Sequence, residues 1–318
     1  MTSRPPADAT LSDLGEFGFI AAVAERFPQG DDVLLGPGDD AAVVSFPDRR
    51  VVVSTDLLVE GRHFRRDWAS AADIGHRAAA QNLSDINAMG GRATALTVGL
   101  AAPPDLSAAW ALELAEGIAA EASALGASVV GGDVTRADAI MIAVTVLGVV
   151  EGEPVRRSGA RVGDVVAIAG RQGWAAAGLA VLARGFRSPR VLVEAHRRPE
   201  PPYSAGPQAA KAGATAMIDV SDGLLADVGH IAESSGVAVD IDSGAFEIPE
   251  PLRAVGAALG ADPMRFILTG GDDHALVATF PSDVDLPDGW KRIGTVSAGS
   301  GVTVDGAEYE GPAGHVHF

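Results

Sequence analysis

The sequence contains no cysteine and only two lysines, Lys211 and Lys291. Without cysteine, the chain can form no disulfide bond, no thiolate nucleophile, no cysteine zinc site and no iron–sulfur cluster. The apolar stretch 17–24 near the N-terminus is short and has acidic residues on both sides, so we predict neither a signal peptide nor a membrane span. We therefore expect a cytoplasmic protein.

Common phosphate-binding motifs are also missing. Neither lysine stands in a glycine-rich loop and no G-x-x-x-x-G-K-[ST] motif is present, which excludes a P-loop enzyme. The His-Arg-Asp and Asp-Phe-Gly motifs of protein kinases are absent as well. The segment 36–41 resembles G-x-G-x-x-A, but no clear strand precedes it and its two aspartates would repel a pyrophosphate. A Rossmann dinucleotide site is therefore disfavoured.

The chain is acidic: its 318 residues carry a net charge of −18, from 24 basic and 42 acidic side chains. This balance argues against nucleic acid or an anionic membrane as a partner, since both are polyanions. Phosphorylated small molecules stay possible, because bound divalent cations turn an acidic site into an anion site. With 47% hydrophobic residues the chain can build two cores, and a polar, glycine-rich stretch separates predicted domains over 1–150 and 151–318.

Six short acidic segments are spread along the chain. They are 38–40 (Gly-Asp-Asp), 54–56 (Ser-Thr-Asp), 82–85 (Asn-Leu-Ser-Asp), 131–133 (Gly-Gly-Asp), 219–222 (Asp-Val-Ser-Asp) and 270–273 (Gly-Gly-Asp-Asp). Each one alone is explained by an ordinary turn or helix N-cap. Together, beside apolar strands, they favour carboxylates that converge on cations, since two like charges 4 Å apart repel by about 4 kcal/mol at an effective dielectric of 20. Magnesium is the cation that prefers such oxygen ligands.

The hydrophobic patterns predict elements in the order β-α-β-α-β-β over the first half, which indicates an α/β (α+β) fold. A predicted helix over 70–89 places Asp85 on its apolar stripe, where a carboxylate is costly unless it is paired or binds metal. In the second half, a helix should open at Ser221, and a short strand should cover 266–269. Asp227, inside the helix after Ser221, has no expected role, so its replacement by asparagine should be nearly silent.

Seven segments together resemble the thiamine-monophosphate kinase family. They read GDDAAV (38–43), STDLLVEGRHF (54–64), NLSDINAMGG (82–91), GGDVTR (131–136), RSGA (157–160), DVSDGLLADVGHI (219–231) and LTGGDDHAL (268–276). The resemblance implies a two-domain synthetase-like fold, in which the N-terminal sheet forms a barrel across a homodimer and a C-terminal α/β domain completes the active site. It also implies ATP bound with several Mg²⁺ ions, and phosphorylation of thiamine monophosphate to thiamine diphosphate.

Carried onto this sequence, the family pattern assigns three kinds of site residue. It implies metal ligands at Asp40, Ser54, Thr55, Asp56, Asp85, Asp133, Asp219 and Asp222. It implies ATP contacts at Gly132, Arg157 and Ser221, and substrate contacts at His63 and Asp272. No side chain is expected to act as a general acid or base, because the transfer would be assisted by metal.

Two other interpretations stay open from the sequence. One is another ATP-dependent synthetase of the same superfamily, similar to aminoimidazole ribonucleotide synthetase. The other is a non-catalytic assembly protein that binds magnesium and nucleotide. Selenophosphate synthetase and the hydrogenase-maturation protein of this superfamily depend on reactive cysteine or selenocysteine, so the absence of cysteine disfavours both.

Overall fold

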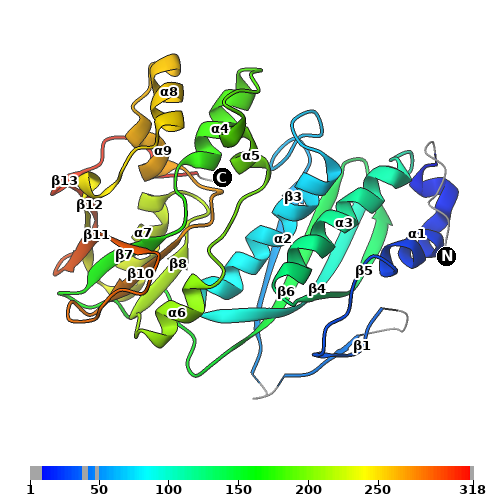
Figure 1. Cartoon of the computed structure of the whole chain (residues 1–318), viewed down its shortest axis with the longest axis horizontal. Helices are drawn as coiled ribbons and strands as arrows, with labels where there is room; N and C mark the ends of the chain where they lie inside the picture. The colour runs from blue at the N-terminus through cyan, green and yellow to red at the C-terminus, as the bar shows by residue number, and fades with distance from the viewer. Residues whose placement is uncertain (1–8, 38–41, 47–49, 316–318) are drawn as a thin grey trace. The chain divides into compact units, whose positions relative to one another are not determined.

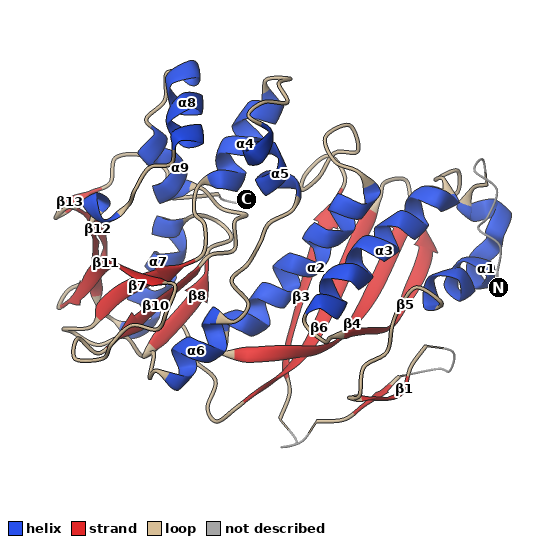
Figure 2. Ribbon diagram, in the orientation of Figure 1, coloured by secondary structure: helices blue, strands red, loops and turns tan. Residues whose placement is uncertain are grey.

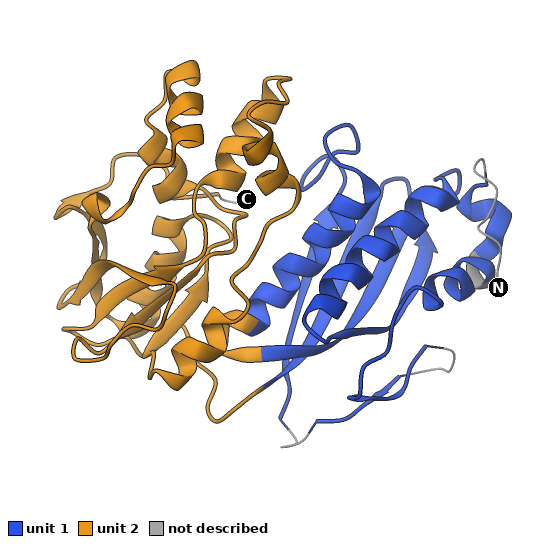
Figure 3. Cartoon of the chain, viewed as in Figure 1, with its two compact units in different colours: residues 1–86, 92–149 blue, residues 87–91, 150–318 orange. Residues whose placement is uncertain are grey.

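The computed structural model describes residues 9–37, 42–46 and 50–315. The chain folds into two compact units (Figure 3). Unit 1 combines Met1–Ile86 with Arg92–Val149, and unit 2 combines Asn87–Gly91 with Val150–Phe318. Over the described residues, no helix has both the length and the apolar character needed to cross a bilayer.

Unit 1 is built on a four-stranded sheet with the order β3-β6-β4-β5. Its strands are β3 (Val52–Val59), β4 (Gly91–Ala102), β5 (Ser128–Arg136) and β6 (Met141–Val150). Two helices, α2 (Ala71–Ala88) and α3 (Ala108–Ala124), lie over one face of this sheet (Figure 1, Figure 2). Helix α1 (Leu11–Ala24) packs beside α3 and β5, and β1 (Val33–Leu35) pairs with β2 (Val43–Val44).

The two faces of the unit 1 sheet differ in their surroundings. On β3, Leu58 is buried on the side of the helices, whereas its neighbour Leu57 is 53% exposed and Val53 is 60% exposed on the opposite side. Strand β6 continues the same surface with Met141, which is 40% exposed. The alternation of side chains along the strands therefore gives one face covered by helices and one apolar face without them.

Unit 2 contains a seven-stranded sheet with the order β13-β12-β9-β11-β7-β10-β8, which curls into a half-barrel (Figure 1). Its strands are β7 (Val165–Ala169), β8 (Ala216–Asp219), β9 (Ala238–Ile241), β10 (Leu276–Phe280), β11 (Trp290–Ser297), β12 (Gly301–Val304) and β13 (Ala307–Glu308). Its helices are α4 (Trp174–Ala183), α5 (Arg190–Arg197), α6 (Ala205–Lys211), α7 (Leu224–Ser235), α8 (Glu250–Leu259) and α9 (Pro263–Thr269), with a 3-10 turn η1 (Ser243–Ala245).

The central strands of unit 2 are buried on both faces. All residues of β7 and β10 are buried, and their side chains contribute to two separate hydrophobic clusters. One cluster includes Val228 and Ile231 of α7, and the other includes Ala205 and Ala209 of α6. Burial on both faces explains why these strands are continuous apolar runs rather than alternating ones.

The mixed α/β, two-domain architecture agrees with the sequence prediction, but the strand predicted over 266–269 is wrong. These residues form the end of helix α9. The helix begins earlier because Oδ1 of Asp262 accepts the backbone N–H of Met264 at 3.0 Å and Pro263 occupies the first turn. The helix expected to open at Ser221 begins only at Leu224, after Gly223.

Candidate functional site

The first group of predicted ligands lies where strand β3 meets helix α2. The hydroxyl of Ser54 donates a 2.6 Å hydrogen bond to Oδ2 of Asp85. The backbone N–H of Asp56 donates to Oδ1 of Asn82, at 3.1 Å, and Asn82 is completely buried. Asp85 is half-buried on the face of α2 that meets the sheet, so its hydrogen bond with Ser54 offsets part of the cost of burial.

Thr55 and Asp133 lie apart from this group. The hydroxyl of Thr55 lies on the other side of β3, where it donates to the carbonyl of Val144 at 3.0 Å. Asp133 and Gly132 are on β5, the opposite edge of the same sheet, so three strand spacings, about 14 Å, separate Asp133 from β3. One copy of the chain therefore does not bring Asp133 and Asp56 to one metal ion. Asp40 lies outside the described residues.

Gly132 is required by the packing of β5 against β4. A Cβ atom at this position would stand 2.0 Å from the carbonyl oxygen of Val98. The pairing of the two strands shifts register just before this point, between Leu96 and Thr97. The Gly-Gly-Asp segment 131–133 is consequently part of a strand and not the turn that its sequence suggested.

His63 sits in the loop that follows β3, and a backbone contact fixes its tautomer. Its Nδ1 atom accepts the N–H of Val59 at 2.9 Å, while its own backbone N–H donates to the Val59 carbonyl. A ring nitrogen that accepts carries no proton, so the neutral ring holds its proton on Nε2. His63 is therefore oriented as a hydrogen-bond donor through Nε2.

In unit 2, two acidic segments far apart in the sequence lie side by side. Beyond the pairing of β8 with β10, Val220 N–H donates to the carbonyl of Ala275 at 2.8 Å, and His274 N–H donates back to Val220 at 3.2 Å. One step further, Asp272 N–H donates to the Ser221 carbonyl at 3.0 Å. The structure thus brings four predicted site residues together: Asp219, Ser221, Asp222 and Asp272.

Glycine makes this close approach possible. A Cβ atom on Gly271 would stand 1.9 Å from the carbonyl oxygen of Ser221. The backbone next to it is strained, since Asp272 and His274 have φ angles of 68° and 53°. Left-handed backbone at residues other than glycine costs of order 1–3 kcal/mol and is concentrated at functional sites. The strain in this segment supports a functional role for it.

Asp219, the first residue of segment 219–222, and His274, which follows segment 270–273, form a buried pair. The Nδ1 atom of His274 lies 3.0 Å from Oδ2 of Asp219, and each residue is only 5% exposed. A histidine hydrogen-bonded to a carboxylate fixes the orientation of that carboxylate toward a ligand. Sequence analysis missed His274, although it directly follows the Gly-Gly-Asp-Asp segment.

Asp227 holds the segment 221–223 through hydrogen bonds to its backbone. Its Oδ2 atom accepts three successive backbone N–H groups, from Ser221 at 3.1 Å, Asp222 at 3.1 Å and Gly223 at 3.0 Å. Burial raises the pKa of Asp227 to about 7, although these N–H donors favour the ionised carboxylate. The expectation that Asp227 has no role is therefore not supported by its contacts.

The two adjacent aspartates of 270–273 have different surroundings. Asp272 is half-buried, whereas Asp273 is 4% exposed and its Oδ1 accepts the N–H of Ala175 at 3.0 Å, at the start of α4. Among the described residues, Oδ2 of Asp273 has no hydrogen-bond partner. Burial raises the pKa of Asp273 to about 7. Asp273 therefore holds α4 in place, and Asp272 is the carboxylate nearer to solvent.

Arg157 is exposed on a loop that α7 anchors. The hydroxyl of Ser235, the last residue of α7, donates to the Arg157 carbonyl at 3.2 Å and accepts the N–H groups of Gly159 and Ala160 at 3.1 and 3.2 Å. The guanidinium forms no ion pair with a described residue. An arginine of this kind can bind two phosphate oxygens at once.

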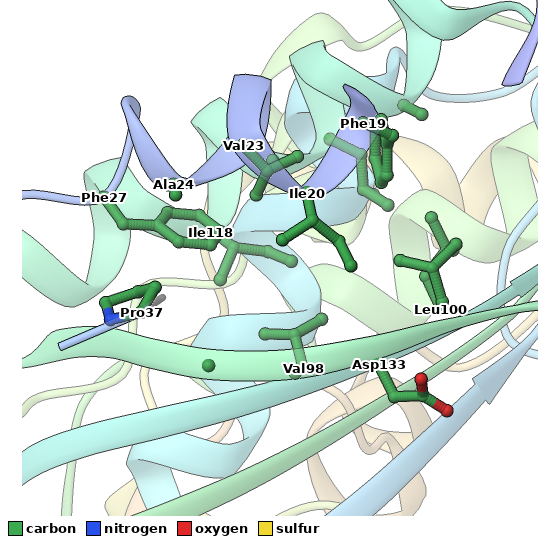
Figure 4. Close-up of a pocket in the computed structure, with 16 residues that line it drawn as sticks. Phe19, Ile20, Val23, Ala24, Phe27, Pro37, Val98, Leu100, Ile118 and Asp133 are labelled. Atoms are coloured by element: carbon green, nitrogen blue, oxygen red, sulfur yellow. The ribbon is translucent and has the colours of Figure 1, made fainter. Parts of the chain in front are cut away.

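An apolar pocket lies between α1 and the edge of the sheet in unit 1 (Figure 4). Its walls are formed by Phe19, Val23 and Phe27 on one side and by Val98 and Leu100 on the other. Gly132 and Asp133 border it, but the rest of the lining is almost entirely apolar. The charged groups of the candidate site lie mostly elsewhere, so this pocket alone does not account for phosphate chemistry.

The donors fit magnesium, although they do not form a complete cage. All of them are hydroxyl and carboxylate oxygens, which Mg²⁺ prefers. Within the described part of the chain, no group of three or more histidine, aspartate or glutamate side chains is arranged to hold a metal ion. In general, one or two carboxylates can bind Mg²⁺ together with water and substrate phosphates.

Models of a known protein family match both halves of the chain. The AIR synthase related protein models match the N-terminal domain over residues 38–150 and the C-terminal domain over residues 161–306. The chain is 49% identical over 312 residues to the thiamine-monophosphate kinase of Mycobacterium tuberculosis, across 97% of this chain and 93% of the relative.

Solved structures give the same result. The thiamine-monophosphate kinase of Stenotrophomonas maltophilia superposes with a TM-score of 0.78 at 34% identity, covering 92% of this chain and 95% of that one. AaThiL complexed with AMPPCP and TMP superposes with a TM-score of 0.80 at 32% identity, covering 98% and 99% of the two chains. The protein therefore belongs to the thiamine-monophosphate kinase family, within the AIR synthase-related proteins.

Proposed function

We propose that the protein transfers the γ-phosphoryl group of ATP to thiamine monophosphate by direct in-line displacement. An oxygen of the acceptor phosphate forms the new bond to the γ-phosphorus, the bond to the leaving oxygen breaks, and ADP and thiamine diphosphate result. The observation that carries the proposal is the pairing of segments 219–223 and 271–275. This pairing brings Asp219 and Asp222, which we assign to metal, next to Ser221 and Asp272, which we assign to ATP and to the acceptor.

The reaction needs no general base from the protein. A phosphate monoester has its second pKa near 6, so the acceptor is largely a dianion at neutral pH. Phosphoryl transfer depends mainly on positioning and on neutralising charge. The residues that we assign to the site meet these two needs. They are hydroxyls and carboxylates, the cationic Arg157, and His63 as a hydrogen-bond donor.

Several Mg²⁺ ions are part of the proposal, with Asp40, Ser54, Thr55, Asp56, Asp85, Asp133, Asp219 and Asp222 as their ligands. When bound, they would cancel the repulsion between two anionic substrates. Arg157 and Ser221 then hold ATP together with the backbone at Gly132. The Nε2–H of His63 is suited to donate to the acceptor phosphate, and Asp272 completes the acceptor side.

We also propose that two copies associate through the bare face of the unit 1 sheet, as a homodimer. Val53, Leu57 and Met141 expose apolar surface there, which is typical of an interaction site. A second copy on this face also gives the isolated Asp133 a route to phosphates held by the other chain. Sedimentation should report a dimer that Leu57→Asp converts to monomer; a wild-type monomer at micromolar concentration would contradict this part.

Measurement of turnover distinguishes the proposed function from the two alternatives that the sequence left open. A synthetase of another type would consume ATP only with its own acceptor, and a non-catalytic assembly protein would bind Mg–ATP without making ADP. A panel of acceptors with ATP, scored for ADP, distinguishes all three. The cytoplasmic location expected from the sequence stays a prediction.

A further inference from the structure

The segment that joins β8 to α7 has an unusual property: all of its backbone hydrogen-bonding groups are used. The N–H groups of Ser221, Asp222 and Gly223 donate to one carboxylate oxygen, Oδ2 of Asp227. Their carbonyls accept from Asp272, His315 and Asp227, at 3.0, 2.8 and 2.9 Å. Protein contacts therefore hold the backbone of this segment, and its polar side chains, Ser221 and Asp222, project from a fixed frame.

We infer that Asp227 is a positioning residue, which fixes the segment 221–223 so that the side chains of Ser221 and Asp222 meet the phosphates of ATP and their metal. The inference rests on the proposed function. Three N–H groups that converge on one oxygen form a cradle for an anion, filled here by a side chain of the protein itself. Gly223 has a φ angle of 144°, in the region that favours glycine over other residues.

The contacts of Asp227 differ from those of an ordinary helix N-cap. Helix α7 begins at Leu224 with Gly223 as its N-cap and without a side-chain cap bond. Asp227 is 2% exposed, and it reaches back past the cap to residues that precede the helix. Its contacts therefore stabilise the conformation of segment 221–223 more than they stabilise the first turn of α7.

Asp164 provides a matched control in the same unit. It is also buried, at 5% exposure, and its Oδ2 accepts the Arg161 N–H at 2.9 Å and the Thr215 hydroxyl at 2.6 Å. It has no assigned role toward ATP, metal or acceptor. Asp164→Ala should thus destabilise the fold much as Asp227→Ala does, without changing the segment 221–223.

The experiment compares Asp227→Ala, Asp227→Asn and Asp164→Ala below their melting temperatures, by amide hydrogen exchange, Mg–ATP affinity and turnover. For Asp227→Ala we expect faster exchange at residues 221–223 and losses of about 10- to 100-fold in Mg–ATP affinity and kcat/KM. Asp227→Asn retains an acceptor oxygen and should recover most of both. Asp164→Ala should stay within about threefold of wild type, a difference of under 1 kcal/mol.

Two outcomes overturn the inference: unchanged exchange at 221–223 in Asp227→Ala, or faster exchange with Mg–ATP affinity no worse than in Asp164→Ala. Failure of the proposed function looks different. In that case wild type makes no thiamine diphosphate, while exchange and Mg–ATP affinity still decide whether Asp227 positions the segment.

Discussion

Replacing Asp273 by asparagine should remove a loss of stability that the wild-type protein suffers as the pH rises from acidic to neutral values. Asp273 is 4% exposed, its Oδ1 holds the N–H of Ala175, and burial raises its pKa from 3.8 to about 7. Asparagine keeps an acceptor for Ala175 but never has to ionise. The variant therefore removes the cost of a buried charge while it retains the contact with α4.

The direction in which stability changes with pH follows from proton binding to Asp273. Between pH 3.8 and about 7 the folded protein keeps a proton on Asp273 that the unfolded chain has lost, so stability falls as pH rises through this window. At 1.36 kcal/mol per pKa unit, the 1.5 units between pH 5.5 and pH 7 correspond to about 2 kcal/mol. The whole window corresponds to about 4 kcal/mol.

Urea unfolding at pH 5.5 and pH 8 measures the effect, and pH 5.5 stays clear of the sequence pI of about 4.6. The free energy of unfolding of Asp273→Asn, relative to wild type, should rise by about 2 kcal/mol from the lower to the higher pH. Asp227 titrates in both proteins, so it cancels in the difference. Asp262→Asn, at the exposed cap of α9, is the control and should show no such change. If Asp273→Asn changes the free energy of unfolding by the same amount at pH 5.5 and at pH 8, the reasoning is refuted.

Four further substitutions test the assigned roles. Asp56→Asn keeps shape but loses charge, so it should lower turnover about a hundredfold or more with an unchanged melting temperature; normal turnover would remove Asp56 from the metal site. His63→Ala should raise KM for thiamine monophosphate and Arg157→Ala should raise KM for ATP, each by about one to two decades; the reverse pattern would invert the site. Gly271→Ala places a methyl group 1.9 Å from the Ser221 carbonyl, so both turnover and melting temperature should fall; an unaffected variant would mean that the two segments need not touch.

Much of the fold could be predicted from local patterns. The helix predicted over 70–89 is α2, because apolar residues recur at helical spacing and Gly90 ends it with a φ angle of 76°. Strands β7 and β10 are buried along their whole length, which accounts for their mostly apolar sequences. The prediction at 266–269 is wrong because a short run of three apolar residues and a threonine fits a strand or a helix equally, and the Asp262-Pro263 start signal decides between them.

The site was harder to predict because its contacts cross long distances in sequence. Segments 219–222 and 270–273 were each recognised, yet their pairing depends on the register of β8 against β10. Segment 131–133 fits a turn by its sequence, although it lies within strand β5, at the opposite edge of the sheet from segment 54–56 in β3. The contacts of Asp227 and His274 are with other residues of the chain, so no local pattern distinguishes them from ordinary polar residues.

The most direct test of the central claim follows the label of [γ-³²P]ATP with purified protein, Mg²⁺ and one acceptor at a time. The account predicts labelled thiamine diphosphate and an equal amount of ADP with thiamine monophosphate, no labelled product with free thiamine, and no reaction when Mg²⁺ is chelated. Label transferred to free thiamine, or ADP formed without labelled thiamine diphosphate, would contradict it.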